Sequence, residues 1–153
     1  PLGIERQMFI LDFPVMIALM LLVYFLAGFR GGIGRASGIV FASIYGVVGP
    51  DFDLYEGTEL ANPAGYAASK GGLLQLMRYL SKALAPAIRV NAITPGGVWR
   101  NRPESFHQRY ISRTPLERMA AEEDMKGAVA YLASDLSAYV TGHNLVVDGG
   151  WTA

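Results

Sequence analysis

A tyrosine and a lysine one helical turn apart are the residues of this sequence best suited to acid–base chemistry. Tyr66 and Lys70 are the ends of Tyr-Ala-Ala-Ser-Lys, so on a helix they share one face. An ammonium about 4 Å from a phenol is worth roughly 4 kcal/mol at an effective dielectric of about 20. Before desolvation opposes it, this attraction would lower the phenol pKa by up to about three units from its usual value of about 10. Such a phenol exchanges protons near neutral pH, although the spacing alone is also common on amphipathic surface helices.

A hydroxyl and a glycine-rich turn are expected beside this pair. Ser43 ends a short apolar run, residues 39–43, that predicts a buried strand, and the turn Pro95-Gly96-Gly97 follows a second predicted strand over 88–93. Ligands of open α/β sheets bind outside the carboxyl ends of the strands. We therefore expect the serine, the phenol and the turn to meet at one sheet edge, where glycine lets a flat ring approach the backbone.

Alternating helices and strands must position these groups. Asn62 is a good N-cap for a helix that starts at Pro63, and helix 122–133 would carry a Glu122–Lys126 ion pair. With an apolar helix over 13–29 at the start and a last strand over 144–148, the order is helix, strand, helix, strand, helix, strand, and a short helix over 103–110 is expected to lie over the turn at Pro95. This order predicts the α/β class: a partial Rossmann-type, doubly wound parallel sheet with helices on both faces.

Composition excludes several classes of function. The chain has 153 residues, 52% of them hydrophobic, a net charge of zero and no cysteine. A balanced charge argues against nucleic-acid binding, and the lack of cysteine removes disulfides and thiolate chemistry. His107 and His143 have no ligand-like spacing, so no metal site is expected. A cytoplasmic location fits this composition. Four arginines are expected to be solvated or paired surface charges: Arg78, Arg89, Arg100 and Arg102.

Residues 13–29 form an uncharged apolar run near the lower limit of length for a membrane span. The favoured interpretation is a buried helix, and a membrane-tethered form is the alternative. The glycine-rich stretch that follows, residues 28–36, is interpreted as a turn into the Ser43 strand. Its Gly28, Gly32 and Gly34 also fit a dinucleotide-binding loop, but no helix follows them as that role requires.

Four segments in order resemble the signatures of the short-chain dehydrogenase/reductase family: residues 39–46, 66–70, 89–96 and 147–150. The resemblance extends over residues 36–153, which would be the catalytic half of the family domain, after a divergent segment over 1–35. Most of the family's N-terminal cofactor-binding half has no counterpart in this sequence.

The resemblance implies roles for individual residues. Ser43 would bind the substrate oxygen, Tyr66 would be the general acid/base, and Lys70 would tune the tyrosine and hold the nicotinamide ribose. Asn91 would order its strand and the neighbouring loop. Three further residues would pack against the nicotinamide: Pro95, Gly96 and Val98. An apparent insertion over 51–62 would either shape the substrate pocket or be a surface excursion.

The expected function is therefore NAD- or NADP-dependent hydride transfer to or from a small carbonyl or alcohol substrate, by a chain that forms homo-oligomers. A non-catalytic remnant of such an enzyme is the second hypothesis, and a membrane-tethered version the third. The substrate and the choice of cofactor are left open.

Overall fold

The computed structural model describes residues 36–153, so the predictions for residues 13–29 and for Gly28, Gly32 and Gly34 lie outside the described part. The helices and strands follow in the order β1 (Ala36–Phe41), α2 (Ala64–Ala83), β2 (Ile88–Pro95), α3 (Glu104–Ile111), α4 (Asp124–Ala133) and β3 (Asn144–Val147). Short 3-10 helices lie between them: η1 (Ile44–Gly46), η2 (Phe52–Tyr55) and η3 (Asp135–Ser137).

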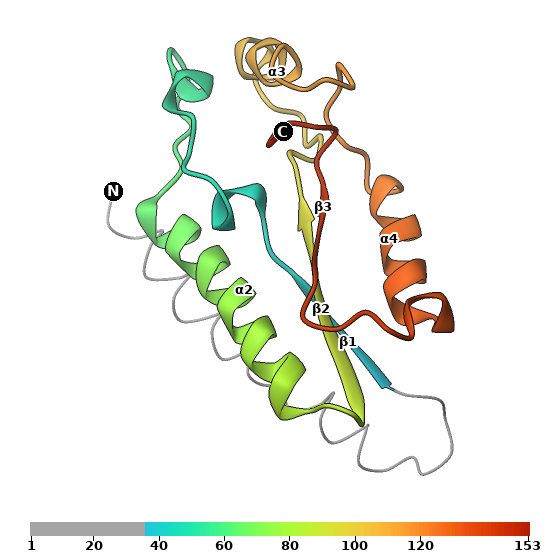
Figure 1. The fold of residues 1–153 in the computed structure, drawn as a ribbon. Coiled ribbons are helices and arrows are strands. Elements are labelled where there is room, and N and C mark those ends of the chain that lie inside the picture. Colours follow the sequence, from blue (N-terminus) through green and yellow to red (C-terminus); the bar gives the residue numbers. More distant parts are fainter. Residues whose placement is uncertain (1–35) are drawn as a thin grey trace. The chain divides into compact units, whose positions relative to one another are not determined.

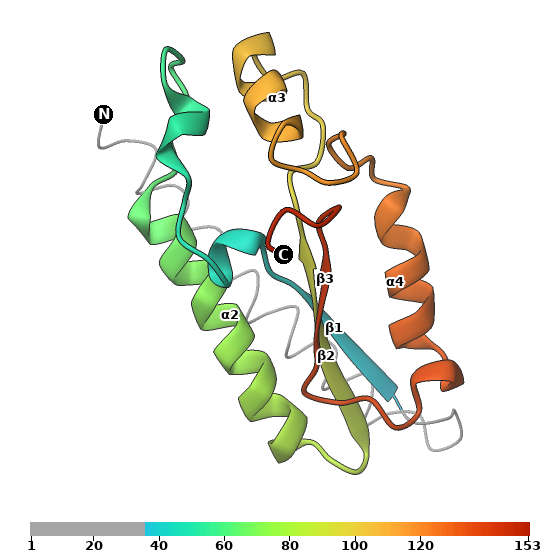
Figure 2. The same cartoon turned by 45° about the horizontal axis from the view of Figure 1, so that its top comes forward.

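The strands form one sheet in the order β1-β2-β3. β2 and β3 are parallel, with Ala92 opposite Asn144 and Pro95 opposite Val147. Figure 1 shows the three strands running in one direction, with α2 on one face of the sheet and α4 on the other. The turned view in Figure 2 shows the same layers, with α3 beyond the carboxyl ends of the strands. The predicted α/β class, with helices on both faces of a parallel sheet, is confirmed.

β2 is the central strand, and every residue from Ile88 to Thr94 is buried. A strand covered by helices on both faces is expected to be apolar throughout, so each polar residue in it needs a partner. The Asn91 amide donates to the Val140 carbonyl at 2.9 Å and accepts from the His143 N–H at 3.0 Å. Asn91 therefore orders the approach to β3.

Arg89 is buried in this strand, with only 6% of its surface exposed. Its guanidinium donates to the carbonyls of Leu132 and Ser134, both at 3.1 Å, at the C-terminal end of α4. It also donates to Ser137 Oγ at 2.9 Å and to the Val140 carbonyl at 3.3 Å. The prediction of a surface charge is wrong for Arg89, because the carbonyls left free at the end of α4 satisfy a buried cation.

The helix that carries Tyr66 starts one residue later than predicted. Pro63 occupies the cap position without a side-chain capping bond, and α2 begins at Ala64. The assignment of Asn62 as N-cap is therefore wrong. Leu73 and Met77 are buried and lie four residues apart, on one face of the helix.

Two smaller predictions also need correction. β1 spans Ala36–Phe41 and is only half-buried, with Phe41 47% exposed, because it lies at the edge of the described sheet. Lys126 pairs with Glu123 at 3.2 Å, and Glu122 pairs with Arg100 at 2.5 Å, so the expected Glu122–Lys126 pair does not form.

Within residues 36–153, no helix has the length and hydropathy to cross a membrane. The same residues contain no group of three or more His, Asp or Glu side chains placed to hold a metal ion.

Candidate active site

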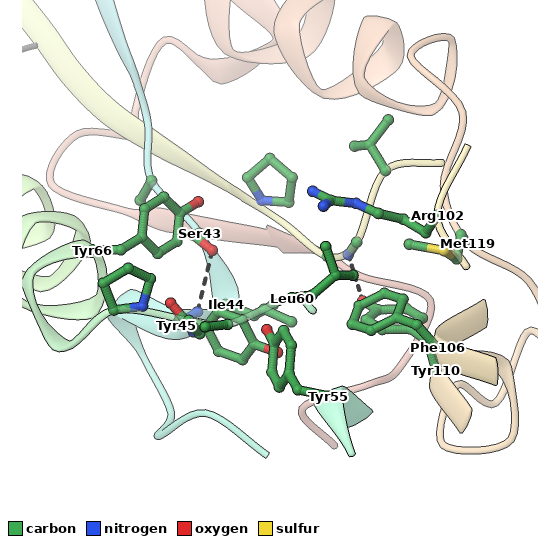
Figure 3. Close-up of a pocket in the computed structure, with 18 residues that line it drawn as sticks. Ser43, Ile44, Tyr45, Tyr55, Leu60, Tyr66, Arg102, Phe106, Tyr110 and Met119 are labelled. Atoms are coloured by element: carbon green, nitrogen blue, oxygen red, sulfur yellow. Dashed lines mark hydrogen bonds between the residues drawn. The ribbon is translucent and has the colours of Figure 1, made fainter. Parts of the chain in front are cut away.

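A cavity of about 440 Å³ opens where β1 and β2 end (Figure 3). It lies between the start of α2 and the segment that contains α3. The ends of β1 and β2 and the segments that follow them contribute Ala42, Ser43, Ile44, Tyr45, Pro95, Gly96, Gly97 and Val98. The segment leading into α2 contributes Tyr55, Leu60, Ala61, Asn62, Pro63 and Tyr66, and the far side contributes Arg102, Phe106, Tyr110 and Met119.

The cavity brings together most of the residues predicted to form the site. Ser43, Tyr66, Pro95, Gly96 and Val98 all line it. Figure 3 shows the hydroxyl groups of Ser43 and Tyr66 in the same part of the cavity. Lys70 is not part of the lining and lies behind Tyr66, one turn further along α2. The structure thus places two hydroxyls at the carboxyl edge of the sheet, in one cavity with a surface formed by Pro95, Gly96 and Val98, called the shelf below.

Ser43 is fixed where β1 passes into η1. The preceding residue ties the two strands together, since the Ala42 N–H donates to the Ile93 carbonyl at 2.8 Å. Ser43 itself is 8% exposed and has extended backbone angles, and its Oγ accepts from the Tyr45 N–H at 3.3 Å. This bond uses a lone pair of the oxygen, so the hydroxyl proton remains available to a ligand.

A close backbone contact sets the spacing between the serine and the tyrosine helix. A Cβ atom at Gly46 would lie 2.7 Å from the carbonyl carbon and oxygen of Lys70 and 3.0 Å from the Gly71 nitrogen. Only glycine lets η1 rest this closely on α2. The distance between the Ser43 segment and the Tyr66–Lys70 turn therefore depends on the absence of a side chain at position 46.

We expect Gly46→Ala to destabilise the fold by about 1–3 kcal/mol, because a methyl group would be forced against backbone atoms that cannot rotate away. Gly72→Ala is the matched control on the same helix, where an added Cβ meets no atom within 4 Å. It should stabilise the chain by about 0.5–1 kcal/mol, the usual gain from alanine in a helix. Urea unfolding of the three proteins measures both values, and equal midpoints for Gly46→Ala and the unchanged chain would refute the close-contact argument.

Lys70 interacts with the ring of Tyr66. Its Nζ lies 5.5 Å from the ring centroid, within the range of a cation–π contact. The expectation from the sequence is an ammonium about 4 Å from the phenol. The structure confirms that both side chains share one face of α2. The Lys70 ammonium lies over the face of the Tyr66 ring.

The other three tyrosines of the cavity are poor proton donors. Burial raises the pKa of Tyr45, and its hydrogen bond with Tyr55 adds to this effect. Burial also raises the pKa of Tyr55, and it raises the pKa of Tyr110 to about 12. All three stay neutral at physiological pH, so they line the cavity as protonated phenols. Tyr66 is the cavity tyrosine that has an ammonium beside its ring.

The glycines of the Pro95-Gly96-Gly97 turn are explained by internal packing. A Cβ at Gly97 would lie 2.7 Å from Cζ of Tyr110, and one at Gly96 would lie 2.9 Å from the Cα of Asp148. The Gly97 N–H also donates to the Tyr110 hydroxyl. The packing of α3 on this turn is therefore one reason for glycine at both positions, and the approach of a flat ring stays a prediction.

The apparent insertion over 51–62 forms one wall of the cavity. Its Tyr55 hydroxyl donates to the Tyr45 hydroxyl at 3.0 Å, and Arg113 holds Asp51 by an ion pair of 2.6 Å. Residues from this wall and from α3 were not singled out in the sequence, because their aromatic side chains are scattered along the chain. The possibility that the insertion shapes the pocket fits this geometry.

The comparisons with known proteins agree with the motifs. The family model described as enoyl-(acyl carrier protein) reductase matches residues 54–152. Post-translational flagellin modification protein A of Campylobacter coli is 38% identical over 114 residues, which are 74% of this chain and 44% of that protein. L-rhamnose 1-dehydrogenase (NAD(P)(+)) of Azotobacter vinelandii is 41% identical over 92 residues, 56% of this chain and 36% of that enzyme.

A solved structure shows the same fold. The short-chain dehydrogenase of Leptospira borgpetersenii, solved with bound NAD+, superposes with a TM-score of 0.73 at 43% identity, over 78% of this chain and 45% of that one. The chain therefore spans less than half the length of these relatives. Because the family model covers well over half of its residues, the chain belongs to the short-chain dehydrogenase/reductase family.

Proposed function

We propose that this chain is an NAD(P)-dependent oxidoreductase that transfers hydride between a nicotinamide cofactor and a small carbonyl or alcohol substrate. The observation that carries the proposal is the pair of hydroxyls, Ser43 and Tyr66, in one cavity beside the shelf of Pro95, Gly96 and Val98. The choice of cofactor is supported by the rhamnose dehydrogenase, which is described as NAD(P)-dependent, and by the Leptospira dehydrogenase, which was solved with bound NAD+.

The described residues fit the nicotinamide end of such a cofactor. Pro95 and Val98 offer an apolar surface to a planar ring, and Lys70 would reach the ribose from α2. The bound nicotinamide would supply or accept the hydride at its C4 atom. The chain's residues contribute the proton and hold the substrate oxygen.

Tyr66 and Ser43 divide that task. In the reductive direction Tyr66 donates its phenolic proton to the substrate oxygen, and in the oxidative direction its oxygen takes the proton back. The free hydroxyl proton of Ser43 donates to the same substrate oxygen, which polarises a carbonyl and orients an alcohol. Lys70 stabilises the negative charge that Tyr66 carries after donation.

Calorimetric titration of the purified chain with NADH and with NADPH tests the proposal. We expect micromolar binding of at least one of them. Val98→Trp, which would fill the shelf, should weaken that binding about tenfold or more. Leu136→Trp is the matched control, since Leu136 is 83% exposed and is not part of the cavity lining. Absence of binding to either cofactor by a folded chain would count against the proposal.

A further inference from the structure

The cavity has aromatic walls and a single charged group. Of the residues that line it, Arg102 is the only one with a formal charge, and no aspartate, glutamate or lysine is among them. Figure 3 shows the Arg102 side chain reaching across the cavity from the α3 side. A cation with no acidic neighbour in an apolar-walled cavity raises the local concentration of anions.

Arg102 differs from the other arginines of residues 36–153. Each of the others has at least one hydrogen-bond or ion-pair partner: Arg78 with Gln75, Arg89 with the end of α4, Arg100 with Glu122, Arg109 with the Glu56 carbonyl, Arg113 with Asp51, and Arg118 with Asp124. Arg102 makes none with any residue of that stretch. Its guanidinium has five N–H donors and a geometry that matches a carboxylate.

A buried donor without a partner lies in the wall of the same cavity. Asn62 Nδ2 is buried and has no hydrogen-bond partner among the residues described, although the side chain lines the cavity. A buried amide without a partner costs about 1–3 kcal/mol, so such a group is usually paired with water or a ligand. The Asn62 side chain does not cap α2, because the helix starts at Ala64 and Pro63 takes the cap position that Asn62 was expected to fill.

We infer that the substrate carries a carboxylate, which Arg102 binds, and that Asn62 donates a hydrogen bond to another of its oxygens. The inference rests on the proposed function for the reacting end of the molecule, which would lie at Ser43 and Tyr66. The aromatic rings of Tyr55 and Phe106 would cover its apolar body. The substrate class is therefore a small oxo acid or hydroxy acid with an apolar or ring-shaped middle.

The test compares benzoate with benzamide, two ligands of nearly equal shape and different charge, in calorimetric titrations of the purified chain. We expect benzoate to bind about tenfold more tightly than benzamide, and Arg102→Met to remove this preference. Arg102→Lys should retain part of it, since lysine keeps the charge without the planar fork. Asn62→Ala should weaken benzoate binding about threefold.

Arg100→Met is the matched control, because Arg100 lies two residues away and is paired with Glu122 at 2.5 Å. It should leave the preference for benzoate unchanged. Equal affinities for the two ligands, no binding of either, or a preference that survives in Arg102→Met would each overturn the inference. Binding of NADH and NADPH to Arg102→Met is measured alongside. If cofactor binding falls while the preference for benzoate persists, Arg102 serves the cofactor phosphates and the inference is wrong.

The outcome is independent of hydride transfer, because benzoate binding needs neither a cofactor nor turnover. A chain that prefers benzoate through Arg102 and yet transfers no hydride would contradict the proposed function alone. A chain that transfers hydride without any preference for the anion would contradict only the carboxylate inference.

Discussion

Tyr66→Phe is expected to lower turnover by a factor of about 10²–10⁴, the usual contribution of a positioned proton donor. The substitution removes one oxygen atom and keeps the ring on which Lys70 rests. The described structure gives the Tyr66 hydroxyl no hydrogen bond to another residue, so its loss should leave the fold intact. Steady-state kinetics measure the effect, and thermal unfolding should show a midpoint close to that of the unchanged chain.

Tyr79→Phe is the control for this experiment. Tyr79 lies on the same helix and is 69% exposed, so the loss of its hydroxyl should change neither turnover nor stability. Ser43→Ala is a less direct probe, because Ser43 Oγ also accepts from the Tyr45 N–H where η1 begins. Turnover by Tyr66→Phe within about twofold of the unchanged chain would remove Tyr66 from the role of acid and base.

Arg89→Met is expected to have the largest effect on stability, a loss of about 3–5 kcal/mol in the free energy of unfolding. The arginine is buried, and its guanidinium serves Leu132, Ser134, Ser137 and Val140. Methionine would fill part of the volume but would remove the charged donor that these carbonyls share, and the Leu132 and Ser134 carbonyls would retain only uncharged bonds to Ser37 and Ser137. Those carbonyls also lie at the negative end of the helix dipole, where a cation is favourable.

Arg89→Lys and Arg78→Met complete the series. Lysine retains the charge but lacks the planar fork that reaches several acceptors at once, so an intermediate loss is expected. Arg78 is exposed and donates to Gln75, and its replacement should change stability by less than about 0.5 kcal/mol. Urea unfolding provides all three values. If Arg89→Met unfolds at the same urea concentration as Arg78→Met, the buried cation does not hold α4 to the sheet.

The sequence pattern was sufficient to predict the main helices and strands and to predict that the candidate site lies at the carboxyl edge of the sheet. The apolar run around Val90 and Ile93, and the helical spacing of Leu73 and Met77, follow directly from burial, so they predict β2 and α2. Ser43, at the end of one strand, had to lie near the turns that follow the others. These arguments are local or depend only on parallel topology.

Three features depended on contacts that no local pattern encodes. Arg89 is buried because the end of a helix more than forty residues later supplies its acceptors. The wall formed by Tyr45 and Tyr55 depends on how the loop over 51–62 folds back. The glycines at 96 and 97 are required by the ring of Tyr110 on α3, which the sequence could not place.

The most direct test of hydride transfer at the Ser43–Tyr66 cavity is the transfer of deuterium from C4-labelled NADH or NADPH to a carbonyl substrate by the purified chain. Aldehydes and ketones with and without a carboxylate are supplied, and the products are analysed by mass spectrometry. The proposed function predicts deuterium on the former carbonyl carbon of at least one product, and nearly none with Tyr66→Phe. Transfer at an equal rate by Tyr66→Phe, or no transfer to any carbonyl by a folded chain that binds the cofactor, would contradict it.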